Sequence, residues 1–181
     1  NGIKRLGLKV LENYEDALSL PEVEALILTS PNDLHDEQVV QAASAGKHVF
    51  CEKPLSLSAA GAKASIKACR TASLILGIGH ERRFEPAILA LRKLLDDGAV
   101  GTVMHTEMAF SHDKLIGLTS DSWRTTSAFA PAAGMTQMGI HLTDLLISFY
   151  GPVTSLHAIT ADRSLGWETG DVVTVQLQFK A

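Results

Sequence analysis

Hydrophobic and polar positions follow a strand–helix–strand rhythm over the first 80 residues. Three short apolar runs, Val23–Thr29, His48–Cys51 and Leu74–Gly79, have the nearly continuous hydrophobicity of strands buried on both faces. Between them, residues 34–45 and 58–71 place apolar side chains at helical spacing. Short connections between such elements imply right-handed crossovers. The pattern therefore predicts an α/β architecture with a parallel sheet.

Polar residues predict where these helices begin and end. Asn32 or Asp33 is placed to cap the first helix, Gly46 to end it, and Ser58 to cap the second. The apolar positions of the first helix are Leu34, Val39, Ala42 and Ala43. Upstream, the chain offers a weak strand, Leu8–Leu11, and a short helix, Glu15–Leu20.

The second part of the chain has a different pattern. Glu85–Leu95 and Met135–Tyr150 have helical spacing, the latter closed by Gly151 and Pro152. Val100–Phe110, Val153–Ala161 and Val172–Phe179 alternate as half-buried strands do. This order predicts part of an α+β domain with a mostly antiparallel sheet.

The change of pattern places a domain boundary after residue 80. We expect residues 1–80 to be the C-terminal portion of one domain, and residues 81–181 to be part of a second. A sheet of two or three strands with one helix leaves a face unburied, and residues 1–20 are weakly patterned. We therefore expect the chain to be an internal fragment of a longer protein.

Composition narrows the class of protein. The chain is 46% hydrophobic and carries a net charge of −4, which is ordinary for a globular protein and gives no reason to expect a nucleic-acid or membrane partner. Two cysteines are too few for a disulfide framework, so the reducing cytoplasm is the expected compartment. No histidines have metal-ligand spacing, and we expect no metal.

Polar residues follow each predicted strand of the first part: Ser30-Pro31-Asn32, Glu52-Lys53-Pro54 and His80. Parallel sheets bind ligands at the carboxyl ends of their strands. Lys53 is fixed beside a proline at this edge, where its ammonium group could donate to a substrate hydroxyl and relay its proton. The alternative is a solvated surface lysine.

The helix over residues 135–150 carries a second candidate group. Met138, Leu142, Leu145 and Phe149 form its apolar stripe, and Gln137, His141 and Asp144 form a polar stripe beside it. His141 could accept a hydroxyl proton as general base while hydride leaves the same carbon. The alternative is a hydrogen-bonded histidine at a domain seam.

Four motifs, taken together and in this order, resemble the glucose–fructose oxidoreductase/inositol dehydrogenase/MocA family. They are Ser30–His35, Gly46–Pro54, Gly79–Pro86 and Gly139–Asp144, and the resemblance runs from about Tyr14 to Tyr150. It implies a partial Rossmann-type domain, followed by part of a substrate and oligomerisation domain. The implied activity is NAD(P)-dependent hydride transfer between nicotinamide and a hydroxyl of a sugar or polyol, by a protein that is homo-oligomeric at full length.

The resemblance also implies roles for individual residues. The catalytic positions are Lys53, His141 and Gln137. The cofactor-binding positions, for NAD or NADP, are Ser30, Pro31, Asn32, His35, Glu52, Lys53, Trp123 and Arg124. The substrate-binding positions are Lys53, His141 and Asp144. For Ser30, Pro31 and Asn32 the alternative is a plain turn and helix cap, and for Glu52 it is pairing with a neighbouring lysine.

The chain departs from the family pattern at three places. Gln137 stands where members usually carry an aspartate, the glycine run before the helix is thinned to Ala132-Ala133-Gly134, and no Gly-x-Gly-x-x-Gly turn is present. We therefore expect the 181-residue chain alone to be inactive. Two further readings stay open: a non-catalytic cofactor-binding regulator on the same fold, and a short degenerate protein with a structural role.

Overall fold

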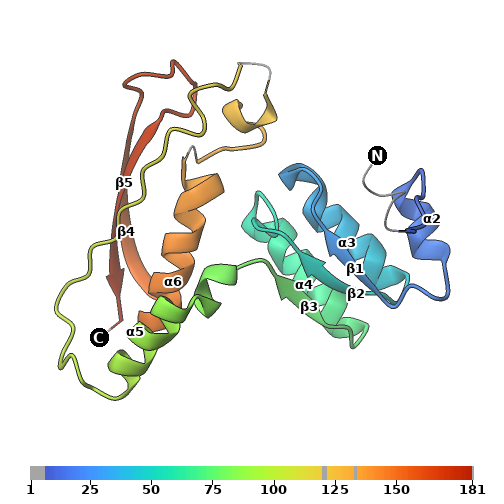
Figure 1. The fold of residues 1–181 in the computed structure, drawn as a ribbon, viewed down its shortest axis with the longest axis horizontal. Coiled ribbons are helices and arrows are strands. Elements are labelled where there is room, and N and C mark those ends of the chain that lie inside the picture. Colours follow the sequence, from blue (N-terminus) through green and yellow to red (C-terminus); the bar gives the residue numbers. More distant parts are fainter. Residues whose placement is uncertain (1–6, 120–121, 133, 181) are drawn as a thin grey trace. The chain divides into compact units, whose positions relative to one another are not determined.

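The computed structural model describes residues 7–119, 122–132 and 134–180, and the chain divides into two compact units, Asn1–Gly79 and His80–Ala181 (Figure 1). Ala133, in the thinned glycine run, lies outside the described residues.

The first unit is an α/β layer built on a parallel sheet, as the sequence predicts. Its elements, in chain order, are α2 (Tyr14–Ser19), β1 (Ala25–Leu28), the 3-10 turn η1 (Asn32–Leu34), α3 (His35–Ser44), β2 (His48–Cys51), α4 (Ala59–Thr71) and β3 (Leu76–Ile78). The strands lie in the order β1-β2-β3. Leu28 pairs with Cys51, and Cys51 pairs with Ile78, so the carboxyl ends of the strands meet at one edge.

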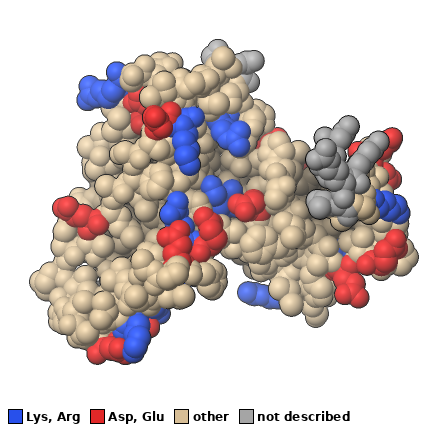
Figure 2. Space-filling view, viewed as in Figure 1, with Lys and Arg blue, Asp and Glu red and all other residues tan. Residues whose placement is uncertain are grey.

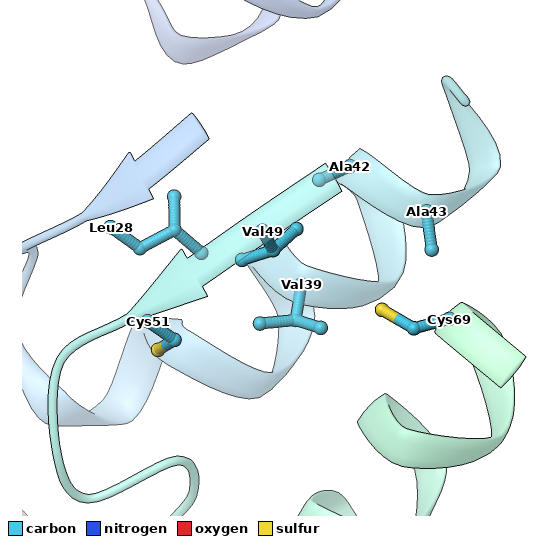
Figure 3. Packing of buried hydrophobic residues seen from close by; sticks show 7 residues of the cluster. All are labelled: Leu28, Val39, Ala42, Ala43, Val49, Cys51 and Cys69. Atoms are coloured by element: carbon cyan, nitrogen blue, oxygen red, sulfur yellow. The ribbon is translucent and has the colours of Figure 1, made fainter. Parts of the chain in front are cut away.

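The core of this unit lies between one face of the sheet and its helices. The buried apolar side chains are Leu28, Val39, Ala42, Ala43, Val49, Cys51 and Cys69, which come from β1, β2, α3 and α4 (Figure 3). The opposite face is open in this chain: Ile27 and Phe50 alternate with the buried positions and are exposed. Because side chains alternate across a strand, burial on one face leaves the other uncovered.

Local signals in the first unit are partly as predicted. Ser58 caps α4, accepting a hydrogen bond from the Gly61 amide at 3.0 Å, and Gly46 follows α3 with a φ of +75°. The predicted cap of α3 was wrong: Asn32 enters the 3-10 turn η1, and no side chain caps the described start of the helix. The predicted strand at Leu8–Leu11 is also wrong, because those residues make no sheet ladder.

The second unit combines helices with an antiparallel pair of strands. Its elements are η2 (Glu81–Phe84), α5 (Pro86–Asp96), η3 (Trp123–Thr125), the π-helical turn η4 (Met135–Gly139), α6 (Ile140–Tyr150), β4 (Val153–Ala161) and β5 (Val172–Phe179). The predicted bounds of both strands are confirmed, and the two strands pair with each other.

The prediction of a strand at Val100–Phe110 is wrong. These residues form no ladder, and all except Met108 are exposed. Alternation of polar and apolar residues stabilises a strand only where one face is buried and the backbone is paired. Neither condition holds here, although the Thr106 hydroxyl lies 2.8 Å from the Tyr150 hydroxyl.

The helix predicted from Met135 to Tyr150 begins with a π-helical turn rather than an α-helical one. A Cβ at Gly139 would lie 2.1 Å from the Met135 Sδ, so the absence of a side chain at Gly139 lets Met135 fold over this turn. A π turn has more residues than an α turn, which shifts the i, i+4 stacking expected between Gln137 and His141. The polar stripe is regular only from His141 onward.

On the face shown in Figure 2, basic and acidic side chains are interspersed. Among the described residues, no helix has the length and apolar character needed to cross a membrane. In the same residues, no group of three or more histidine, cysteine, aspartate or glutamate side chains is arranged to hold a metal ion.

Candidate active site

The carboxyl edge of the parallel sheet gathers several of the predicted cofactor-binding residues. The Glu52 amide donates to the Leu28 carbonyl at 2.9 Å, which continues the β1–β2 ladder to the end of the strands. The Glu52 carboxylate then lies against Gly79, where a Cβ would be 3.0 Å from Oε2. Glycine at position 79 leaves room for the carboxylate, so Glu52 and Gly79 together shape the edge.

Lys53 follows Glu52 and is held by its backbone. Its amide donates to the Glu52 carboxylate at 3.3 Å, and its peptide bond to Pro54 is cis. Pro54 is buried, whereas Lys53 and Glu52 are partly exposed. The backbone of Lys53 is thus fixed at the edge of the sheet while its side chain retains access to solvent.

His35 joins two of the strand-end loops. Its Nδ1 lies 2.7 Å from the Pro54 carbonyl, and its Nε2 lies 2.9 Å from the Ser30 carbonyl. The side chain is 1% exposed. The buried face of α3 therefore includes His35, together with the predicted Val39, whereas the predicted Leu34 is exposed.

Two more side chains from the first turns of α3 reach the same loops. The Ser30 hydroxyl donates to Gln38 Oε1 at 2.5 Å, and the Ser56 hydroxyl donates to Asp36 Oδ2 at 2.6 Å. A Cβ at Gly61 would meet the Asp36 carboxylate and the Ser56 hydroxyl, so glycine there leaves room for this pair of side chains. The start of α3 is tied to both strand-end loops.

In the second unit, His141 lies at the start of α6 among charged side chains. It is 4% exposed, and its Nδ1 lies 3.9 Å from Glu81 Oε2. The His80 ring packs edge-on at a centroid distance of 6.2 Å. His141 thus lies beside one carboxylate and one imidazole ring.

Asp144, one turn along α6, is held by Arg83. The guanidinium Nε and Nη2 donate to the two carboxylate oxygens at 2.7 and 2.5 Å, and His80 Nε2 lies 3.8 Å away. Hydrogen bonding to Asp144 raises the pKa of the Arg83 guanidinium. Bidentate arginine–carboxylate pairs are among the stronger polar interactions in proteins, so Asp144 is fixed in orientation.

Gln137, Arg124 and Trp123 form a third group within this unit. The Gln137 side-chain amide donates to the Arg124 carbonyl at 3.0 Å. The Arg124 guanidinium carbon lies 4.1 Å from the centre of the Trp123 ring, a cation–π contact. Gln137 thus ties the π-helical turn to the η3 segment that carries the two predicted cofactor-binding residues.

Sequence patterns identified most members of these groups but not their partners. The motif Gly79–Pro86 contains His80, Glu81 and Arg83, yet the sequence assigned no partner to His141 or Asp144. Arg83 pairs with Asp144 across 61 residues, whereas Arg82 pairs locally with Glu85. The spacing of residues along the sequence gives no signal of such long-range pairs. Two adjacent arginines before a helix were the only visible hint.

The carboxyl edge fits one half of a nicotinamide dinucleotide. Glu52 offers a carboxylate that can accept hydrogen bonds from ribose hydroxyls, and Lys53 offers a cationic donor beside it. The space beside Gly79, which the Glu52 carboxylate occupies, supports this assignment. The described residues contain no glycine-rich turn for the diphosphate, so these residues fit the nicotinamide-ribose half only.

Both parts of the chain match protein-family models. Residues 3–80 match "Oxidoreductase family, NAD-binding Rossmann fold", and residues 88–181 match "GFO/IDH/MocA C-terminal domain". The sequence is 29% identical over 163 residues to inositol 2-dehydrogenase of Rhizobium meliloti, covering 86% of this chain and 46% of that protein.

Solved structures resemble the fold along nearly the whole chain. A putative NADPH-dependent oxidoreductase from Desulfitobacterium hafniense has a TM-score of 0.90 at 30% identity. The WlbA dehydrogenase from Bordetella pertussis, in complex with NADH and UDP-GlcNAcA, has a TM-score of 0.87 at 25% identity. Each match covers 99% of this chain and 52% of the other, so the chain spans about half the length of these relatives.

Proposed function

Because the chain belongs to the GFO/IDH/MocA oxidoreductase family, with its NAD-binding Rossmann fold, we propose that its protein transfers a hydride between a nicotinamide cofactor and a hydroxyl of a sugar or polyol. The observation that carries this proposal is the position of Lys53. It follows β2 at the carboxyl edge of the sheet that the NAD-binding family model covers, between the Glu52 carboxylate and the buried Pro54. Lysine at that edge is suited to a substrate hydroxyl.

Lys53 polarises the reacting hydroxyl in this proposal. Its ammonium group donates a hydrogen bond to the hydroxyl oxygen, which stabilises the negative charge that develops as the proton leaves. A nicotinamide cofactor, NAD or NADP, would supply the hydride acceptor for the carbon that bears this hydroxyl. The proposed contacts for its ribose half are Ser30, Pro31, Asn32 and Glu52.

His141 is the proposed general base. It accepts the hydroxyl proton, and the Glu81 carboxylate at 3.9 Å stabilises the resulting imidazolium. Glu81 then supplies the negative charge that the neutral amide of Gln137 cannot supply. Asp144, oriented by Arg83, is the proposed substrate contact, and Trp123 and Arg124 are proposed cofactor contacts.

The wider setting is part of the same proposal. We place the protein in the cytoplasm as a homo-oligomer acting on a small molecule. Cys51 and Cys69 are buried and unpaired, which suits a reducing compartment. The pKa of Cys51 is raised to about 12, through burial first and then through Glu52 and Asp36, so this thiol is no nucleophile at neutral pH.

The test is turnover by the protein expressed from its complete reading frame. A panel of sugars and polyols is offered with NAD or NADP, and reduced nicotinamide is followed by absorbance. Lys53→Met and His141→Asn should each lower kcat at least about a hundredfold, as expected for lost proton-transfer groups. Lys67→Met, an exposed lysine on α4, is the matched control and should leave kcat unchanged. Full activity of Lys53→Met would overturn the assignment.

A second candidate, a cofactor-binding regulator, is favoured by one observation. Gln137 stands at a position that is usually acidic in the family, and its amide donates to the Arg124 carbonyl. This reading predicts tight binding of the dinucleotide with no turnover on any substrate of the panel. Calorimetric binding of NADH beside the turnover assay separates the two functions.

A further inference from the structure

The buried face of α3 carries a histidine whose two ring nitrogens both approach backbone carbonyls. His35 Nδ1 lies 2.7 Å from the Pro54 carbonyl and Nε2 lies 2.9 Å from the Ser30 carbonyl. A carbonyl oxygen only accepts, so the ring is the donor of any hydrogen bond that forms at either nitrogen. A doubly protonated ring donates to both at once, whereas a neutral ring donates to one.

The two carbonyls belong to different strand-end loops. Ser30 follows β1, and Pro54 follows Lys53 after β2. The loops carry different parts of the proposed site: the first carries Ser30, Pro31 and Asn32, and the second carries Lys53. The single ring of His35 therefore links a loop that carries proposed cofactor contacts to the loop that carries Lys53.

We infer that His35 is a positioning residue that clamps the cofactor loop and the Lys53 loop to the start of α3. This inference deepens the proposed function and rests on it for the roles of the two loops. It replaces direct contact with the cofactor, the role that resemblance implies for His35. The His35 side chain is 1% exposed, and both of its ring nitrogens lie close to backbone carbonyls of the loops. Its contacts are therefore with the loops rather than with a cofactor.

Neighbouring contacts support the clamp from both sides. Gln38 accepts from the Ser30 hydroxyl at 2.5 Å, and Asp36 accepts from the Ser56 hydroxyl at 2.6 Å. These bonds keep each loop near α3, but each touches one loop only. His35 approaches both loops through one rigid group.

Two amide variants divide the clamp. The side-chain nitrogen of asparagine is as many bonds from Cα as Nδ1 of histidine, and that of glutamine is as many bonds as Nε2. His35→Asn should therefore keep the bond to Pro54 and lose the bond to Ser30, whereas His35→Gln should do the reverse. Each variant releases one loop and holds the other.

The first readout needs no catalysis. Hydrogen–deuterium exchange is compared in the complete protein for peptides covering residues 29–33 and 52–56. His35→Asn should speed exchange in the first segment only, and His35→Gln in the second only. His48→Ala is the matched control: it removes a ring whose Nδ1 accepts from the Ile75 amide at 2.9 Å, at the opposite end of β2. It should leave both loops unchanged.

The second readout splits the kinetic constants. His35→Asn should raise KM for the cofactor about fivefold with little change in kcat, and His35→Gln should lower kcat about fivefold with little change in that KM. These sizes are typical of one lost hydrogen bond. Equal effects of both variants on both loops, or a lower melting temperature alone, would show an ordinary core histidine. If the wild-type protein proves inactive, the proposed function fails while the exchange result still decides the clamp.

Discussion

The two units differ in how they bury their apolar residues. The first closes a continuous core, with seven apolar side chains from two strands and two helices (Figure 3). In the described part of the second, only Ala130 and Leu145 are buried and apolar, while Leu94, Leu156 and Ile159 are exposed. In the first unit, a packed core therefore supports the polar residues at the carboxyl edge of the sheet. The second unit, with fewer buried apolar side chains, depends more on ion pairs.

The two units also differ in what surrounds their buried histidines. His35 lies between backbone carbonyls, which fix its position. His141 instead lies beside the Glu81 carboxylate and the His80 ring, which are both ionisable side chains. A histidine fixed by carbonyls suits positioning, and one beside a carboxylate suits proton transfer.

The largest expected effect compares matched core truncations. Leu28→Ala should destabilise the first unit by about 3 kcal/mol, because packed neighbours cannot collapse into the space. Leu145→Ala should cost the second unit about 2 kcal/mol, since its looser surroundings relax more easily. Hydrogen exchange under mild denaturant reports each unit separately. Equal losses would show that the second unit is as tightly packed as the first.

The next effect tests the dependence of the second unit on ion pairs. Arg83→Met should destabilise it by about 1–2 kcal/mol, because Asp144, only 11% exposed, loses a bidentate partner. The matched control is Lys93→Met, which breaks the exposed helical pair with Asp97 and should cost about 0.3–0.5 kcal/mol. Chemical denaturation followed by the fluorescence of Trp123 and Trp167, which both lie in this unit, measures both costs. If the two variants lose a similar unfolding free energy, the Arg83–Asp144 pair contributes no more than an exposed ion pair does.

A smaller effect is expected in the β4–β5 connection at acid pH. Burial acts to raise the pKa of Asp171, but hydrogen bonds from the Arg163, Ser164 and Leu165 amides outweigh it and lower that pKa below its ordinary 3.8. Its contribution to stability is thus present above pH 3.8 and lost as pH falls through the lowered value. Asp171→Asn should weaken protection of residues 163–165 near neutral pH and flatten the acid dependence. An unchanged acid profile would contradict this.

The smallest effect lies at alkaline pH in the first unit. Burial, then Glu15 and Cys51, raise the pKa of Tyr14 from 10.0 to about 12, and its hydroxyl donates to the Gln38 carbonyl at 2.8 Å. The stability that this group contributes is present below pH 10.0 and lost as pH rises toward 12. Tyr14→Phe should make the alkaline fall shallower. An identical slope in both proteins would assign the fall to other groups.

Sequence patterns predicted the parallel sheet because hydrophobic periodicity follows burial. They also predicted both strands of the second unit, although β4 is exposed over most of its length and is held by pairing with β5. They misplaced the helix cap at Asn32 or Asp33 and the strand at Val100–Phe110, where tertiary pairing decides. The π turn before His141 depends on Met135 folding over Gly139, a contact that no period encodes.

For the candidate site, patterns and resemblance predicted Lys53 and His141 but missed Glu81 and Arg83 as partners. They also gave no sign that His35 joins two loops, because its partners are backbone carbonyls that any sequence provides. Contacts of this kind emerge only from the folded chain.

The most direct measurement of the central claim traces the hydride itself. The complete protein is given NAD or NADP with polyols and sugars deuterated at the carbon that bears the hydroxyl, and the nicotinamide is analysed by mass spectrometry. We predict that the reduced nicotinamide gains the deuterium, transferred as deuteride, and that Lys53→Met abolishes this gain while Lys67→Met retains it. Tight binding of the dinucleotide, with no deuterium transferred from any compound, would contradict the oxidoreductase assignment and favour a regulator.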